Sequence, residues 1–177
     1  MNIVVYCGST TGNKNSYSEK ARKLGEWIAE HGHTLVYGGA DGGLMGAVAN
    51  GALSKGGKVI GVLPDVEEIQ KRRHMSLTEY INTKDMAQRK AAMIELADAY
   101  IALPGGPGTL DELSDIVSLS RLRLDENPCV MYDMDGYYQP LSKVFDGMIE
   151  AGFAEKEDFR NVLVSDDQDE IGNFIER

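Results

Sequence analysis

Three glycine-rich segments, each directly after a short apolar run, constrain the fold of this chain more than any other feature. Residues 7–12, 38–43 and 104–109 read CGSTTG, GGADGG and PGGPGT. The runs before them are typical of buried strands, and helical patterns follow the second and third segments. Glycine lets a backbone turn sharply and approach a ligand closely. The three segments are therefore expected at the carboxyl ends of parallel strands, along one edge of a sheet.

The rest of the chain alternates short apolar runs with helical patterns. Strands are predicted at residues 3–6, 34–37, 58–63, 80–83, 99–103, 129–132 and 162–164. Helices are predicted at residues 16–30, 44–54, 85–98, 109–122, 138–150 and 168–176. Alternating strands and helices favour a parallel sheet with helices on both faces. With 177 residues and no linker, we expect one nucleotide-binding α/β domain over residues 1–177, a Rossmann-like doubly wound sheet.

The charge and the cysteines narrow the function classes. The formal net charge is −10, so repulsion from a phosphate backbone argues against nucleic-acid binding. No apolar run approaches a membrane span, and we expect no signal peptide and no membrane partner. Cys7 and Cys129 lie far apart and are expected to be reduced thiols of a cytoplasmic protein. Neither the cysteines nor the three histidines have metal-ligand spacing, so no metal or cofactor is predicted.

The glycine segments point to an anion, because backbone N–H groups and the positive end of a following helix attract negative charge. Gly106-Pro107-Gly108 lacks the third glycine of a dinucleotide fingerprint, and residues 51–57, which read GALSKGG, lack the Gly-Lys-Ser/Thr sequence that ends a P-loop. Neither an NAD enzyme nor a P-loop ATPase is favoured, and a single phosphate of a mononucleotide fits better. The alternative is that the glycines only form tight turns.

Glu112 is the sharpest candidate for chemistry. It follows Thr109 by three positions, so one interpretation is an ordinary capping box. The other places its carboxylate one turn inside a helix whose N-terminus binds phosphate. There it would orient a water or stabilise positive charge developing on a sugar ring. Its neighbour Asp111 points elsewhere on the helix and ranks lower.

Arg89 and Lys90 share a helix face with Met86 and Met93 by their spacing. They are either the solvated charges of an amphipathic helix or a local positive charge for a bound phosphate. A second basic run, residues 71–74, is expected in a loop at the surface or at the same pocket.

Several motifs together resemble the LOG (Lonely Guy) family. Residues 104–112 read PGGPGTLDE and match its PGGxGTxxE motif, while residues 86–90 read MAQRK and resemble its M-H-x-R-K motif. Residues 7–9, 37–46 and 135–138 match as well, so the resemblance spans nearly the whole chain. It implies a Rossmann-like homodimer that hydrolyses the N-glycosidic bond of nucleoside 5′-monophosphates, with Arg89 and Glu112 as the catalytic pair. The expected substrate-binding residues are Gly8, Ser9, Gly39, Met86, Lys90, Gly105, Gly106, Gly108 and Thr109.

The chain also departs from that family. Ala87 replaces the usual histidine, Pro107 stands where tyrosine is frequent, and residues 118–128 differ from the common pattern. The base specificity therefore stays open, with AMP and possible cytokinin riboside monophosphates as expected substrates. The alternative function is a non-catalytic carrier of a nucleotide or of a molybdenum-cofactor-type ligand. The combination of Glu112 with Arg89 favours the enzyme, because a carrier needs no such pair.

The predicted helix at residues 109–122 is apolar around more than one face, which suggests a second burial partner. That partner is either a neighbouring helix of the same chain or, as the resemblance implies, a second copy with both sites near the interface. The apolar residues are Leu110, Leu113, Ile116, Val117, Leu119 and Leu122.

Overall fold

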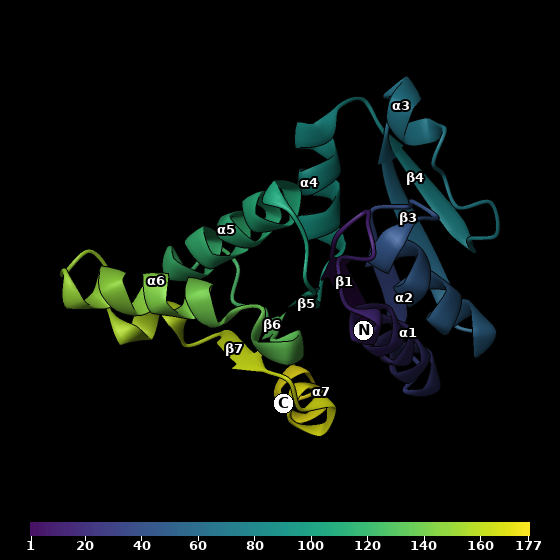
Figure 1. Ribbon diagram of the computed structural model, residues 1–177. Coiled ribbons are helices and arrows are strands. Elements are labelled where there is room, and N and C mark those ends of the chain that lie inside the picture. The colour runs from purple at the N-terminus through teal and green to yellow at the C-terminus, as the bar shows by residue number, and fades with distance from the viewer.

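The computed structural model describes residues 1–177 and contains one seven-stranded sheet (Figure 1). Its strand order is β4-β3-β2-β1-β5-β6-β7, and every neighbouring pair is parallel. The chain begins in the middle of the sheet, adds strands toward one edge and then crosses β1 to build the other edge. The predicted doubly wound α/β fold is confirmed. The strands are β1 (Asn2–Tyr6), β2 (Thr34–Tyr37), β3 (Lys58–Pro64), β4 (Glu79–Thr83), β5 (Ala99–Ala102), β6 (Cys129–Tyr132) and β7 (Val162–Ser165).

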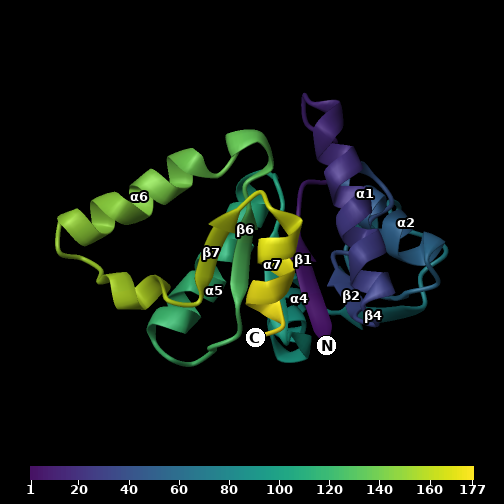
Figure 2. The same cartoon turned by 90° about the horizontal axis from the view of Figure 1, so that it is seen from below.

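Helices cover both faces of this sheet, and each face has its own core. One core joins the sheet to α1 (Asn15–Glu30), α2 (Gly43–Ser54) and α7 (Gln168–Ile175). The other joins it to α4 (Met86–Leu96), α5 (Pro107–Arg121) and α6 (Gln139–Glu150). Figure 2 shows α5 and α6 on one side and α1 and α2 on the other, with α6 extending outward.

The buried stretches of the central strands are continuously apolar because successive side chains enter opposite cores. In β1, Ile3 and Val5 belong to the core under α1 and α2, whereas Val4 and Tyr6 belong to the core under α4 and α5. All four side chains are at most 3% exposed.

Glycines let α1 and α2 approach each other closely. A Cβ atom at Gly25 in α1 would lie 2.0 Å from the carbonyl oxygen of Val48, and one at Gly51 in α2 would lie 2.1 Å from that of Arg22. No side chain fits at either position. The small-residue pattern of residues 44–54 therefore encodes backbone-to-backbone packing of the two helices.

Five of the six predicted helix starts differ from the structure by one or two residues. α1 begins at Asn15, one residue before the predicted start, with Lys14 as its N-cap. Ser16 and Glu19 have the spacing of a capping box, but the hydroxyl of Ser16 donates to Asp135, near the start of α6. Three short helices were not predicted, since each is about one turn long: α3 (Glu67–Gln70), η1 (Met134–Gly136) and η2 (Lys156–Phe159).

The largest difference concerns α5, which begins at Pro107, two residues before the predicted start, with Gly106 as its N-cap. Proline suits the first helical position, because its fixed φ is helical and no N–H is needed there. Thr109 is therefore inside the first turn, where it cannot act as the N-cap of a capping box with Glu112.

No helix of the structure combines the length and the apolar character that a membrane crossing requires.

Candidate functional site

A cavity of about 490 Å³ opens at the carboxyl edge of the sheet, where β1, β2 and β5 end. The glycine segments after all three strands contribute to its wall, as the sequence predicts. The first turns of α4 and α5 close one side, and α3 closes another. Its lining residues are Cys7, Gly8, Ser9, Gly38, Ala40, Met45, Glu68, Ile69, Arg72, Met86, Arg89, Gly106, Pro107, Gly108, Thr109, Asp111 and Glu112.

Arg89 and Glu112 meet in the wall of this cavity as a buried ion pair. Arg89 Nη1 lies 2.7 Å from Glu112 Oε1, and both side chains are only 8% exposed. Arg89 Nε also donates to the carbonyl oxygen of Val62 in β3, at 3.1 Å. Two helices and a strand thus hold the pair in one geometry. The interpretation of Arg89 and Glu112 as a catalytic pair requires that the two side chains lie this close together.

Close packing against a glycine also positions the guanidinium group. A Cβ atom at Gly38 would lie 2.3 Å from Arg89 Nη2. Only glycine at this position, directly after β2, leaves room for the guanidinium group. The absence of a side chain at Gly38 thus makes room for the Arg89 side chain, in addition to any role of this glycine in a turn.

Burial dominates the protonation of Glu112. Loss of hydration raises the pKa of its carboxyl group above the usual value, although the charge and the hydrogen bond of Arg89 oppose that shift. Burial likewise raises the pKa of the Cys7 thiol, and the negative charge of Glu112 adds to this effect. Cys7 is therefore a neutral wall residue, while Glu112 is a carboxyl group that holds a proton more readily than an exposed glutamate does.

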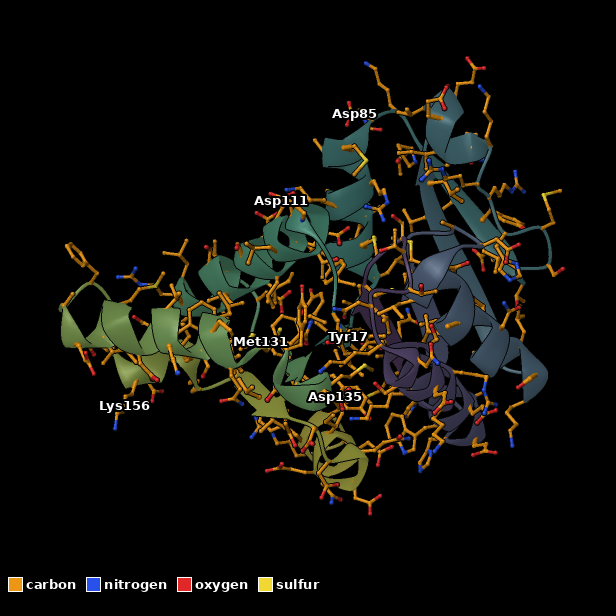
Figure 3. All side chains as sticks on the ribbon, in the orientation of Figure 1. Tyr17, Asp85, Asp111, Met131, Asp135 and Lys156 are labelled. Atoms are coloured by element: carbon orange, nitrogen blue, oxygen red, sulfur yellow. The ribbon has the colours of Figure 1, made fainter.

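The neighbouring charged residues of α4 and α5 pair on the outside. Lys90 Nζ lies 2.9 Å from Asp111 Oδ2 and 2.8 Å from Asp115 Oδ2. Figure 3 shows Asp111 at the start of α5, on the side that faces α4. Asp111 reaches the rim of the cavity but is neutralised by Lys90, which agrees with its lower rank in the sequence analysis.

The start of α5 has the features of an anion site. Gly108 and Thr109 lie in the first turn, where backbone N–H groups have no acceptor within the helix. Below them, the N–H of Gly8 donates to the carbonyl oxygen of Pro104 at 3.0 Å, which joins two of the glycine segments. A phosphate bound here would meet free N–H groups and the positive end of a 15-residue helix.

Three of the predicted binding residues lie outside the cavity wall. Gly39 is buried with φ +78° and packs against Leu63. Lys90 points to the surface, and Gly105 lies behind the loop against Thr109. The other predicted residues, Gly8, Ser9, Met86, Arg89, Gly106, Gly108, Thr109 and Glu112, all line the cavity.

The sequence analysis missed the wall formed by α3 and the residues after it. Glu68, Ile69 and Arg72 line the cavity from this side. Of these, only Arg72 lay in a segment singled out beforehand, the basic run at residues 71–74. Hydrogen bonds between the backbones of Asp41 and Arg72 and of His74 and Gly39 fasten this segment over the edge of the sheet. These long-range contacts leave no local sequence pattern.

The fold and the cavity together define a Rossmann-like α/β protein whose candidate site, with a buried arginine–glutamate pair, lies at the carboxyl edge of its sheet. A family model described as "Possible lysine decarboxylase" matches residues 45–174. The chain belongs to this family, which includes the LOG proteins that its motifs resemble.

Named relatives match over almost the whole chain. A cytokinin riboside 5′-monophosphate phosphoribohydrolase of Rhodococcoides fascians is 42% identical over 93% of this chain and 84% of its own length. The enzyme of the same name from Arabidopsis thaliana is 38% identical over 92% of this chain and 76% of its own length. The LOG enzyme of Oryza sativa subsp. japonica is 39% identical, over 92% and 67%.

Solved structures share the fold. The molybdenum cofactor carrier protein of Chlamydomonas reinhardtii superposes with a TM-score of 0.74 at 24% identity, covering 99% of this chain and 98% of its own. The molybdenum cofactor binding protein of Rippkaea orientalis gives a TM-score of 0.72 at 19% identity, covering 99% and 93%. At these identities the likeness concerns the fold alone.

Proposed function

We propose that this protein hydrolyses the N-glycosidic bond of nucleoside 5′-monophosphates, releasing the free base and ribose 5-phosphate. The observation that carries the proposal is the buried pair of Arg89 and Glu112 in the wall of a glycine-lined cavity. Relatives about 40% identical are named as phosphoribohydrolases of cytokinin riboside monophosphates, which supports the same reaction class.

In this mechanism, each part of the site has one role. The N–H groups of Gly108 and Thr109 hold the 5′-phosphate at the start of α5. The carboxylate of Glu112 orients the attacking water or stabilises the oxocarbenium-like ribose. Arg89 fixes the position of that carboxylate and offsets its charge. Because both partners are buried, their geometry is set before the substrate arrives.

The first experiment tests the phosphate. Purified protein is incubated with AMP or with adenosine, and free adenine is quantified by chromatography. AMP is expected to be cleaved at least about tenfold faster, because charge-assisted hydrogen bonds to the phosphate are lost with adenosine. Equal rates on the two compounds would contradict the role assigned to Gly108 and Thr109.

The second experiment tests the carboxylate. Glu112→Gln keeps the shape of the side chain and is expected to lose on the order of 10² in kcat, as for a positioned acid–base group. Asp115→Asn is the matched control, because Asp115 also lies on α5 and pairs with Lys90 at the surface, but does not line the cavity. If Glu112→Gln turns over AMP like the wild type and only unfolds earlier, the residue is structural.

A carrier function is the second candidate, because the structural neighbours include molybdenum cofactor carriers. The buried Arg89–Glu112 pair favours the enzyme, since a carrier has no need of it. Tight binding of AMP without any release of adenine would favour the carrier. A decarboxylase that uses a lysine-bound pyridoxal phosphate finds no support, because no lysine lines the cavity.

We also propose a homodimer formed beside the cavity. Leu113 and Ile116 of α5 are buried within their own chain, but Leu110 is 47% and Met86 is 44% exposed. These two apolar side chains lie in the first turns of α5 and α4, next to the candidate site. Light scattering at micromolar concentration is expected to give a mass near twice 19.4 kDa. A monomer mass for the active protein would refute the dimer.

A further inference from the structure

A second cavity lies beyond α3, on the far side of the segment that closes the candidate active site. It has a volume of about 590 Å³, and all six residues that line it are polar or charged. Figure 1 shows α3 above β4 at this end of the molecule. The lining residues are Asp65, Gln70, Arg73, Asn82, Thr83 and Lys84.

The two cavities share one wall. Ile69 and Arg72 face the candidate active site, whereas Gln70 and Arg73 line the second cavity. Side chains three residues apart lie on the same side of this helical turn, so the segment presents one pair to each cavity. A molecule in the second cavity would therefore contact the same backbone that carries Arg72.

The wall of the second cavity carries a net positive charge, with Arg73 and Lys84 against one carboxylate, that of Asp65. Neither Arg73 nor Lys84 has a carboxylate oxygen within 4 Å, whereas Lys58 and Lys71 are paired with carboxylates. In a chain of net charge −10, two cations against one carboxylate in a polar cavity favour an anionic ligand.

Arg73 is held in place before any ligand binds. Its guanidinium carbon lies 3.6 Å from the centre of the Tyr80 ring, and the Tyr80 hydroxyl is fixed by a hydrogen bond to the carbonyl oxygen of His74. The Nε atom of Arg73 is buried and has no hydrogen-bond partner. A buried donor without an acceptor costs about 1–3 kcal/mol, and an ordered water or a bound ion is one explanation for such groups in native proteins.

We propose that this second cavity binds a phosphate group of a small molecule, separately from the candidate active site. Arg73 supplies a planar fork of donors, Lys84 a compact charge and Asn82 a side-chain amide. Together these groups suit a tetrahedral oxyanion. The cavity is larger than a phosphate group, so it also has room for the organic part of a phosphate ester.

The test is a titration of the isotopically labelled full chain with inorganic phosphate and with pyrophosphate, followed by amide NMR signals. Signals of residues 82–84 report the second cavity, and those of Gly106 and Gly108 report the candidate active site. Pyrophosphate is expected to shift the signals of residues 82–84 in a saturable way. Saturation with phosphate at equal affinity would identify a site for one phosphate group, and tighter binding of pyrophosphate a site for a longer phosphorylated molecule.

Arg73→Gln with Lys84→Met is expected to weaken that binding by at least about tenfold, the loss of one charge-assisted hydrogen bond. Lys156→Met, a charge removal at the far tip of the molecule (Figure 3), is expected to leave it unchanged. The proposal would be overturned if the signals of residues 82–84 did not shift, or if the double variant bound pyrophosphate as tightly as the wild type. Shifts confined to Gly106 and Gly108 would overturn it too, while leaving the proposed enzyme function intact.

Discussion

Replacing Arg89 by methionine tests the free-energy cost of leaving a buried carboxylate without its counter-charge in the candidate site. The substitution keeps an apolar stem but leaves the Glu112 carboxylate, 8% exposed, without its counter-charge. Breaking a buried pair by removing one partner costs about 3–5 kcal/mol. The lost hydrogen bond to the Val62 carbonyl oxygen adds about 1 kcal/mol. Lys90→Met is the matched control, since its pairs are at the surface and are worth about 1 kcal/mol or less.

The destabilisation caused by Arg89→Met is expected to increase with pH. Burial already raises the pKa of Glu112, and Arg89 is the main group that lowers it, so Arg89→Met raises the pKa further. A carboxyl group whose pKa is higher in the folded than in the unfolded state stabilises the fold fully below the unfolded value. That stabilisation is lost as the pH rises through the folded pKa. The variant is therefore expected to be penalised less at mildly acidic than at alkaline pH.

The measurement is urea unfolding, followed by circular dichroism at mildly acidic and at alkaline pH. The variants are Arg89→Met, Glu112→Gln, the double variant and the Lys90→Met control. The double variant is expected to be more stable at alkaline pH than Arg89→Met alone, because it removes the unpaired buried charge. The reasoning fails if Arg89→Met costs no more than Lys90→Met. It fails equally if the second substitution adds to the destabilisation.

Three further outcomes are expected. Gly38→Ala places a Cβ atom 2.3 Å from Arg89 Nη2 and is expected to displace the guanidinium group. AMP turnover is then expected to fall on the order of 10², the contribution of a positioned acid–base group. Unchanged kinetics would contradict this expectation. Gly51→Ala, with a Cβ atom 2.1 Å from a backbone oxygen of α1, is expected to lower the unfolding free energy by about 1–3 kcal/mol, whereas Gly147→Ala, in open space on α6, is expected to raise it by about 0.5–1 kcal/mol. Cys7, whose pKa is raised by burial, is expected to react with iodoacetamide only after denaturation, and rapid labelling of the native protein would show that the cavity wall opens.

The short-range features of this protein were encoded locally, and for that reason they could be predicted. Apolar runs that enter two cores must be uninterrupted, so the strands were visible as such. Glycines after β1, β2 and β5 indicated the backbone segments that line the candidate site. The PGGPGTLDE segment at residues 104–112 combined a loop, a helix start and Glu112, which made the position of the candidate carboxylate predictable.

The start of α5 shows where local patterns mislead. Thr109 and Glu112 have capping-box spacing, but Pro107 can occupy the first helical position, and Gly106 became the N-cap. The spacing alone did not distinguish these starts, because threonine and glycine are both common N-cap residues. The difference matters for the site, because it places Thr109 inside the first turn, at the cavity wall.

The sequence by itself determined the order of strands and helices along the chain, the edge of the sheet at which the candidate site lies and the residue types available there. Only the tertiary structure decided which of them meet. The pairing of Arg89 with Glu112 spans 23 positions, and its strength comes from the burial of both groups. The wall formed by Glu68, Ile69 and Arg72 likewise depends on hydrogen bonds to the loop after β2. Such contacts depend on how the helices pack on the sheet. Burial and the distance between two side chains are properties of the assembled fold and cannot be derived from a local segment of sequence.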